Sequence, residues 1–302
     1  MNKILLLGAN GQVGWELQRA LAPLAQLVAC DRERADLNDL DALTRLVTTE
    51  RPDIIVNAGA YTAVDKAESD LANARRINAE AVRVLASAAR TSNAWLVHYS
   101  TDYVFNGQGR QPFSEDAPTG PLGIYGQTKL EGELAIREIG CRHLILRTSW
   151  VYATRGANFA KTILRLAKER DELRVIADQV GAPTSAELIA DITALILRDL
   201  MSKPALRENA SGTYHLVASG ETSWHQFARF LIDEAIRLGA SLRTSPDRIA
   251  PISTSEYPTA AQRPANSRLA NGKLQQTFGL VLPHWEHHAQ RTVRELVDLG
   301  IV

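Results

Sequence analysis

Short, continuously apolar runs alternate with longer helical patterns along the first half of this 302-residue chain. The apolar runs are KILLLG, LVACD, DIIVNAG, AWLVHYS and HLILRTSWVY, and the segments between them include VGWELQRALAPL and ARRINAEAVRVLASAAR. Strands that are buried on both faces read as continuous apolar runs, and helical crossovers between them make the strands parallel. Because such crossovers are right-handed, the pattern predicts a Rossmann-type, doubly wound parallel sheet of the α/β class.

The alternation of apolar runs and helical patterns becomes less regular after Trp150, where helical patterns, short strands and irregular stretches such as STSEYPTAAQRPANS follow one another. No low-complexity linker separates the two parts. We therefore predict a Rossmann domain over 1–150 and, over 151–302, mainly a smaller C-terminal α/β lobe. Parts of the later segments are expected to return to the sheet.

Composition excludes several classes of protein. Lys plus Arg equals Asp plus Glu at 34 each, so no net field attracts nucleic acid or a membrane surface. Cys30 and Cys141 lack metal or redox spacing, which indicates a reducing compartment. The opening apolar run is too short for a signal peptide, and no later run has the length of a membrane span. We expect a cytoplasmic protein with neither nucleic acid nor membrane as a partner.

The segment GANGQVG, residues 8–14, follows the first apolar run and opens a helical pattern. Its glycines let the backbone turn tightly and approach a pyrophosphate at a helix N-terminus, although a plain strand-to-helix turn reads the same way. Asp31 ends the second run and could hold the ribose hydroxyls of an adenosine, or simply cap a loop. Arg32 and Arg34 could instead accept a 2′-phosphate. The choice between NADH and NADPH therefore stays open.

Two further strand ends carry small or polar residues. In NAGAYTAVDKAE, the small residues at 58–60 let a backbone lie against a cofactor, while an Asx-type turn is the alternative. In HYSTDYVF, Thr101 and Asp102 fall where ligands sit in an open α/β sheet, although a turn or a helix cap is the common role of such residues.

Tyr125 and Lys129 lie four positions apart in GIYGQTKLEGE, where a helix is expected to begin. Most such pairs are surface contacts. However, a ketone reduced by hydride becomes an alkoxide and needs a proton. Tyrosine has a reference pKa of about 10, and a lysine ammonium one turn away lowers that pKa toward neutrality. Thr101 could polarise the carbonyl. The joint pattern predicts a proton-delivery device.

The chain resembles the extended short-chain dehydrogenase/reductase superfamily through the glycine loop and Tyr-x-x-x-Lys. More narrowly, GQVGWEL, AYTAVDKAE and HYSTDYVF resemble the dTDP-4-dehydrorhamnose reductase family, and the likeness runs over essentially the whole chain. The resemblance implies that NADPH or NADH reduces the C4 ketone of dTDP-4-dehydro-6-deoxy-L-mannose, giving dTDP-L-rhamnose for surface glycans such as lipopolysaccharide O-antigen. Tyr125 would donate the proton, Lys129 would lower its pKa and hold the nicotinamide ribose, and Thr101 would orient the carbonyl.

The resemblance also implies binding residues. Those expected to contact the cofactor are Gly8, Asn10, Gly11, Gln12, Val13, Gly14, Asp31, Asp36, Leu37, Ala60, Tyr61, Thr62, Tyr99, Tyr125 and Lys129. Those expected to contact the dTDP-sugar are Thr101, Asp102, Trp150, Arg263 and Asn266. A core role for Trp150, and a loop role for Arg263 and Asn266, stay open as alternatives.

A metal is implied only by the resemblance, which matches Glu16, Glu187 and Glu295 to Mg²⁺ ligands at the contact of a homodimer. Three carboxylates can supply the oxygen ligands that Mg²⁺ prefers. Alternatively, the three glutamates are ordinary solvated residues on helix surfaces. The expected chemistry needs no metal.

Related activities are the alternatives. Dehydratases of the superfamily carry Thr-Asp-Glu, whereas Asp102 is followed by Tyr103 here. Another sugar-nucleotide reductase or an epimerase with the same Thr and Tyr-x-x-x-Lys stays open. The Cys/His pair of GDP-fucose synthase-like enzymes is not recognisable, since Cys141 and His143 read as structural. A relative that acts as a non-catalytic regulatory subunit of methionine adenosyltransferase leaves a binding module open.

Overall fold

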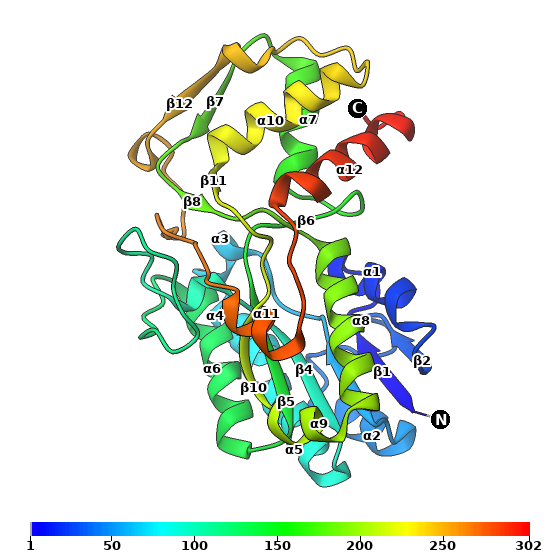
Figure 1. The fold of residues 1–302 in the computed structure, drawn as a ribbon. Coiled ribbons are helices and arrows are strands. Elements are labelled where there is room, and N and C mark those ends of the chain that lie inside the picture. The colour runs from blue at the N-terminus through cyan, green and yellow to red at the C-terminus, as the bar shows by residue number, and fades with distance from the viewer. Residues whose placement is uncertain (1) are drawn as a thin grey trace.

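Within residues 2–302, which the computed structural model describes, six parallel strands form the central sheet in the order β10-β5-β4-β3-β1-β2 (Figure 1). The strands are β1 Lys3–Leu7, β2 Gln26–Cys30, β3 Ile54–Asn57, β4 Trp95–Thr101, β5 His143–Thr148 and β10 Gly212–His215. The chain runs outward from β1 to β2 and then crosses back to β3, so the strand order reverses beside β1. The predicted doubly wound sheet is confirmed.

Helices cover both faces of the sheet because successive side chains of a strand point to opposite sides. Ile4 and Leu6 of β1 share a core with α1 and α8, whereas Leu5 and Leu7 share a second core with α2, α5 and α6. The helices around the sheet are α1 Gln12–Leu21, α2 Leu40–Glu50, α3 Val64–Ala67, α4 Leu71–Arg75, α5 Ala81–Ser92, α6 Ile124–Ile139, α8 Ala186–Ser202, α9 Pro204–Asn209 and α11 Gly272–Phe278. A π-helical turn, Arg76–Glu80, joins α4 to α5, and the 3-10 turn Asp102–Val104 follows β4.

The smaller lobe lies beyond the carboxyl ends of the strands (Figure 1). Its helices are α7 Phe159–Glu169, α10 Trp224–Arg237 and α12 Trp285–Asp298, and its 3-10 turns are Pro246–Arg248 and Thr254–Glu256. Its strands pair two by two: β7 Leu173–Ile176 with β12 Ile249–Ile252, β8 Val180–Gly181 with β11 Thr222–Ser223, and β6 Val151–Tyr152 with β9 Thr184–Ser185. Between these elements the chain returns to the sheet as α8, α9 and β10, and α11 also lies beside the sheet.

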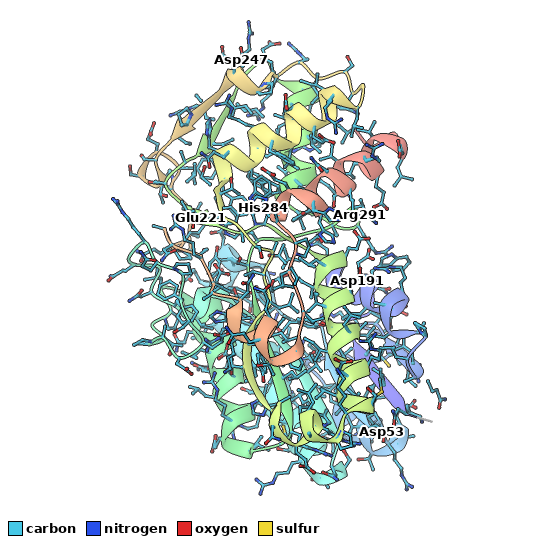
Figure 2. The ribbon with its side chains drawn as sticks, in the orientation of Figure 1. Asp53, Asp191, Glu221, Asp247, His284 and Arg291 are labelled. Atoms are coloured by element: carbon cyan, nitrogen blue, oxygen red, sulfur yellow. The ribbon has the colours of Figure 1, made fainter. Side chains whose placement is uncertain are left out.

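One hydrophobic core joins the lobes, since Leu6 of the sheet and Phe227 of α10 belong to the same buried cluster. Figure 2 shows Asp191 on α8 and Arg291 on α12 on the same side of the molecule, where the lobes meet. None of the helices in residues 2–302 combines the length and the apolar character needed to cross a membrane. Cys30 and Cys141 are buried free thiols.

Candidate active site

A cleft of about 590 Å³ opens at the carboxyl ends of the central strands. The predicted site residues that line it are Gly8, Gly11, Gln12, Val13, Ala60, Thr62, Tyr99, Thr101, Asp102, Tyr125, Lys129 and Trp150. A groove of about 760 Å³ lies at the other ends of the strands, between α2 and α5, and none of the predicted residues lines it. The structure thus gathers residues from three βα units and from the lobe junction around one cavity.

The glycine loop forms a cradle at the start of α1. Gly8 has φ +77°, and a Cβ on it would lie 2.6 Å from the backbone nitrogen of Gly59. Gly11 donates its N–H to the Gly8 carbonyl at 3.0 Å and caps α1 without a side-chain hydrogen bond. The first amide groups of α1 therefore lack side-chain partners and face the cleft where Gln12 and Val13 line it. This arrangement fits the pyrophosphate of a dinucleotide.

Three of the other predicted cofactor residues support this cradle from outside the cleft. A Cβ on Gly14 would lie 2.0 Å from the Gly8 carbonyl oxygen, so Gly14 lets α1 pack closely on the loop. Asp31 accepts the backbone N–H groups of the turn that follows it, and Asn10 Nδ2 donates to Asp31 Oδ2 at 3.2 Å.

Asp36, Leu37 and Tyr61 also lie outside the cleft lining. Asp36 accepts hydrogen bonds from Asn38, and Leu37 is buried beneath Gly59. Tyr61 donates its hydroxyl to Asp70 Oδ2 at 3.0 Å. These contacts shape the loops that carry the lining residues.

Asn78, which the sequence did not single out, fixes the loop after β3. It lies in the π-helical turn and is buried. The Tyr61 N–H donates to Asn78 Oδ1 at 2.9 Å, while Asn78 Nδ2 donates to the Tyr61 carbonyl at 3.1 Å and to Thr128 Oγ1 at 3.2 Å. π-turns inside helices often mark functional positions. Here the turn ties the loop that carries Ala60 and Thr62 to α6.

The helix α6 places Tyr125 and Lys129 on one face, one turn apart. It packs so closely on the 3-10 turn after β4 that a Cβ on Gly126 would lie 2.1 Å from the Tyr103 carbonyl oxygen. The rings of Tyr103 and Tyr125 meet edge to face with centroids 5.4 Å apart. The packing brings Tyr125 against Thr101, as the sequence predicted for a joint site.

The predicted lowering of the Tyr125 pKa by Lys129 is not found in the chain itself. Desolvation raises the pKa of Tyr125 to about 12, and the neighbouring Thr101 hydroxyl only partly opposes this rise. Burial lowers the pKa of Lys129 to about 8, against the attraction of Glu133 for the ammonium. Tyr125 therefore keeps its proton at neutral pH, so the proton is present when a ligand requires it.

Asp102 is a buried carboxyl beside Thr101. Burial raises the pKa of Asp102 to about 6, although the nearby Ser267 and Thr101 side chains oppose this rise. The Thr101 hydroxyl donates to Asp102 Oδ1 at 3.0 Å. Its Oδ2 is buried and has no hydrogen-bond partner. An unpartnered carboxyl oxygen in a cleft is suited to accept a hydrogen bond from a ligand.

The cleft's outer wall is aromatic. Trp150 has φ +50°, and its indole stacks on that of Trp224 with the ring centroids 3.6 Å apart. Trp224 begins α10 of the smaller lobe and also lines the cleft. The sequence did not indicate Trp224 as a site residue, because no local pattern shows that α10 approaches the sheet.

Arg263 and Asn266 do not line the cleft. Arg263 pairs with Asp65 at 2.7 Å, while its Nη1 is buried without a partner. Against the effect of burial, the Ala261 N–H and Arg263 together lower the pKa of the Asp65 carboxyl. The Asn266 amide nitrogen donates to the carbonyls of Gln108 and Gln111, and its Oδ1 accepts from Arg268. Asn266 thus serves as a brace between loops.

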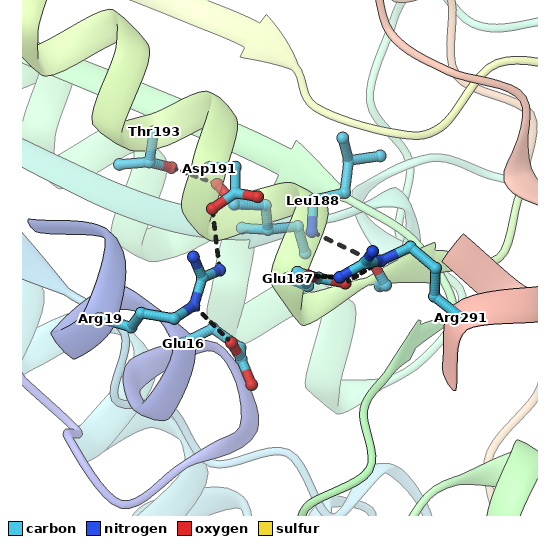
Figure 3. A network of polar contacts seen from close by, with 9 residues as sticks. Glu16, Arg19, Glu187, Leu188, Asp191, Thr193 and Arg291 are labelled. Carbon is cyan, nitrogen blue, oxygen red and sulfur yellow. Dashed lines mark hydrogen bonds and ion pairs between the residues drawn. The ribbon is translucent and has the colours of Figure 1, made fainter. Parts of the chain in front are cut away.

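The Mg²⁺ site expected at a homodimer contact stays a prediction. Among residues 2–302, no group of three or more His, Cys, Asp or Glu side chains could hold a metal ion. Glu187 forms a two-point ion pair with Arg291, and Glu16 pairs with Arg19 (Figure 3). Burial is the main cause that raises the pKa of Glu16, and the neighbouring charges of Glu187 and Glu295 add to it. In the single chain, Glu16 and Glu187 thus have arginine partners.

Two polar residues in apolar strands, Asn57 and His98, lie behind Lys129 and outside the cleft lining. Both are buried, and His98 Nε2 lies 3.1 Å from Lys129 Nζ. The signal was present in the sequence, since each interrupts a continuous apolar run, but the pairing needs the sheet to bring them together.

A doubly wound sheet, a glycine cradle, a strand-end threonine and a buried Tyr-x-x-x-Lys pair around one cleft define a short-chain dehydrogenase/reductase. Comparison with known proteins narrows this class. The model of the RmlD substrate binding domain matches residues 1–297. The chain therefore belongs to the dTDP-4-dehydrorhamnose reductase family.

Curated relatives and solved structures agree with this family. The dTDP-4-dehydrorhamnose reductase of Escherichia coli K12 is 52% identical over 297 residues, which are 97% of each chain. That of Burkholderia thailandensis is 50% identical and covers 98% of this chain and 99% of its own. The crystal structure of the Bacillus anthracis reductase, in complex with NADP, matches with a TM-score of 0.87 at 34% identity, covering 98% of this chain and 100% of that one.

Proposed function

We propose that this chain is an NAD(P)H-dependent oxidoreductase that reduces the C4 ketone of dTDP-4-dehydro-6-deoxy-L-mannose to dTDP-L-rhamnose. The observation that carries the proposal is the meeting of Thr101, Tyr125 and Lys129 with the glycine cradle around one cleft. The substrate rests on the family, whose curated members in Escherichia coli and Burkholderia thailandensis are dTDP-4-dehydrorhamnose reductases.

In this proposal the reduced nicotinamide supplies the hydride, and the chain supplies the proton and the alignment. Tyr125 donates its phenolic proton to the C4 oxygen as negative charge develops there. Thr101, whose hydroxyl donates to Asp102 Oδ1 in the free chain, would turn to donate a hydrogen bond to the same oxygen and orient the carbonyl. Lys129 stands beside the nicotinamide ribose, stabilises the phenolate left on Tyr125 and returns a proton to it.

For the cofactor, we propose that the amide groups of Gly11, Gln12 and Val13 bind the pyrophosphate, and that Ala60, Thr62 and Tyr99 contact the remaining parts. Asp31 would hold the adenosine ribose after releasing Asn10. The NADP in the Bacillus anthracis reductase supports this use of the cradle. Gly8, Gly14, Asp36, Leu37 and Tyr61 would shape the cradle and its walls. Residues 1–150 would thus form most of the cofactor domain.

For the substrate, we propose that Asp102 accepts a hydrogen bond from a sugar hydroxyl and that Trp150 packs on the sugar nucleotide. Arg263 has a buried, unpartnered Nη1 that can donate to a diphosphate oxygen. Asn266 would act indirectly by bracing the loop that carries Arg263. The smaller lobe within 151–302 would provide the outer wall of the substrate site.

The setting is part of the proposal. We place the enzyme in the cytoplasm, where reduced nicotinamide cofactors are available and where the free thiols Cys30 and Cys141 stay reduced. The dTDP-sugar would be its partner. Association into a homodimer, expected from the family resemblance, is checked by light scattering of the purified protein.

The deciding experiment measures oxidation of NADPH and of NADH with the 4-keto sugar nucleotide made in situ, for wild type and for Tyr125→Phe. We expect rapid oxidation by wild type, dTDP-L-rhamnose as the product, and a loss of at least about a hundredfold in the variant. If both cofactors bind and neither is consumed, the reductase proposal fails. A binding module or another sugar-nucleotide activity would then replace it.

A further inference from the structure

A chain of hydrogen bonds runs from the loop after β3 to the catalytic lysine. The Gly59 N–H donates to Asn57 Oδ1 at 3.2 Å, and Asn57 Nδ2 lies 3.2 Å from His98 Nδ1. On the other side of the ring, His98 Nε2 lies 3.1 Å from Lys129 Nζ, which donates to the Tyr99 carbonyl at 2.6 Å. Asn57, His98 and Lys129 are each 1% exposed, so their polar atoms depend mainly on protein partners.

The backbone of Gly59 fixes the direction of this chain. Asn57 must turn its oxygen toward the Gly59 N–H, because its amide nitrogen there would place two donors face to face. Asn57 Nδ2 therefore donates to His98 Nδ1, which is the acceptor nitrogen of the ring. Burial and the neighbouring lysine lower the pKa of His98 well below its ordinary value, so the ring is neutral. Its single ring proton then lies on Nε2 and points at Lys129.

We infer that His98 favours the neutral amine form of Lys129 by donating a hydrogen bond from Nε2 to Nζ. An ammonium carries three donors and no acceptor, so it would meet the Nε2–H of His98 donor to donor. The amine has a lone pair for Nε2–H and keeps a hydrogen for the Tyr99 carbonyl. His98 is thus a positioning residue that acts through Lys129.

The charges of the other groups around Lys129 do not explain why it prefers the neutral amine form. On α6, the Glu133 carboxylate one turn away attracts the ammonium, and Tyr125 lies on the cleft side. The strand β4 contributes His98 and the Tyr99 carbonyl, and the turn after β4 contributes Asp102. Since a carboxylate also favours an ammonium, only burial and the donor on His98 oppose the charged lysine.

The preference of Lys129 for the amine form has a consequence for catalysis, which rests on the proposed function. After Tyr125 has protonated the alkoxide, its phenolate takes a proton from the Lys129 ammonium: the N–H bond breaks and the O–H bond forms. The amine that remains is the form that Nε2–H of His98 stabilises. A solvent proton entering through the cleft, which Lys129 lines, then restores the ammonium. His98 would therefore assist the reset of the proton donor.

The first test reads the imidazole in the free protein and does not depend on any substrate. Nitrogen NMR of protein labelled at histidine distinguishes a protonated from an unprotonated ring nitrogen, and His98→Gln identifies the resonances. We expect Nδ1 of His98 without a proton and Nε2 with one. A proton on Nδ1, alone or together with Nε2, would overturn the inference even if the chain proves to be the proposed reductase.

The second test titrates Lys129 itself. Carbon NMR of the lysine Cε in the free protein reports its pKa, with Lys129→Met to assign the signal. His98→Gln can turn an amide oxygen toward the lysine and should raise the Lys129 pKa by about one unit, the equivalent of one hydrogen bond. The matched control is His215→Gln, which replaces another buried histidine on the sheet, away from the cleft. It should leave the Lys129 pKa unchanged.

Kinetics complete the test. If the Lys129 ammonium assists catalysis, kcat/KM falls as pH rises through the lysine pKa, and His98→Gln should move this alkaline limb upward by the same unit. Thermal unfolding of both histidine variants separates loss of stability from the pH shift. An unmoved or lowered Lys129 pKa in His98→Gln contradicts the inference, whatever the remaining activity.

Discussion

The indole rings of Trp150 and Trp224 stack with their centroids 3.6 Å apart and their planes 11° from parallel. Trp150 lies between β5 and β6, and Trp224 begins α10, so the stack joins the two lobes at the cleft. The φ of +50° at Trp150 is strained for a residue with a side chain. The stack is one contact that holds this strained residue in place.

Replacing Trp224 should therefore weaken substrate binding more than it slows the chemical step. Trp224→Ala removes the partner that orients Trp150, and an aromatic pair contributes about 1 kcal/mol beyond its buried area. We expect the KM for the sugar nucleotide to rise roughly tenfold, with kcat changed much less. The control is Trp15→Ala on α1, outside the cleft and 45% exposed, which should leave KM unchanged. An equal loss of kcat at unchanged KM would contradict this role.

Glu133 should be among the most sensitive charged residues for folding. Its buried carboxylate forms a two-point pair with buried Arg147 at 2.8 and 2.6 Å, and accepts the Ser100 hydroxyl at 2.6 Å. Glu133→Ala leaves the guanidinium of Arg147 buried and uncompensated, which costs about 3–5 kcal/mol. Urea unfolding measures this loss.

The control for Glu133 lies on the same helix. Glu131→Ala removes a half-exposed pair with Arg75, and such pairs contribute about 1 kcal/mol or less. Comparable losses of stability in the two variants would show that Arg147 does not need Glu133 to compensate its buried charge. Of the two losses of stability, only that of Glu131→Ala should become smaller at high salt.

Asp102 should make stability depend on pH. Its pKa is raised to about 6 in the folded chain, so the protonated form favours folding. This contribution is complete below the unfolded value near 4 and is lost as pH rises through about 6. Asp102→Asn imitates the protonated carboxyl at every pH. It should raise the free energy of unfolding by up to about 3 kcal/mol at pH 8, at roughly 1.4 kcal/mol per pKa unit, and by nothing near pH 3.

Denaturant unfolding across this pH range tests the Asp102 prediction. Asp116→Asn, which changes an exposed acid, should show no such pH-dependent gain. If Asp102→Asn is less stable than wild type at pH 8, the carboxylate form must have partners that outweigh its burial.

The sheet and the placement of Tyr125 and Lys129 on one helical face could be predicted because both depend on local periodicity. The alternation in β1 sends Ile4 and Leu6 to one core and Leu5 and Leu7 to the other, which a continuous apolar run requires. Helical spacing places Tyr125 and Lys129 on one face once α6 forms. Such features need only the rise and period of one element.

Other parts of the site depend on segments that meet only in the folded chain. His98 reaches Asn57 because β4 pairs with β3, in the register that sets Asn57 opposite His98. The π-turn that aims Asn78 at Tyr61 has no periodicity of its own that distinguishes it from the helices on either side. Some later segment was expected to return to the sheet, but the sequence did not indicate that it is β10, because the apolar pattern of β10 fits either lobe.

The glycine cradle offers the last prediction, because two glycines differ sharply in the space around them. A Cβ on Gly14 would lie 2.0 Å from the Gly8 carbonyl oxygen, a backbone atom held by the Gly11 N–H, whereas nothing lies within 4 Å of a Cβ on Gly272. Gly14→Ala must push α1 away from the loop, so we expect reduced stability and at least tenfold weaker NADPH binding by calorimetry. Gly272→Ala, at the start of α11, should be neutral or stabilise by about 0.5–1 kcal/mol through lower chain entropy. If Gly14→Ala binds NADPH as wild type does, close packing of α1 on the loop is not what shapes the cradle.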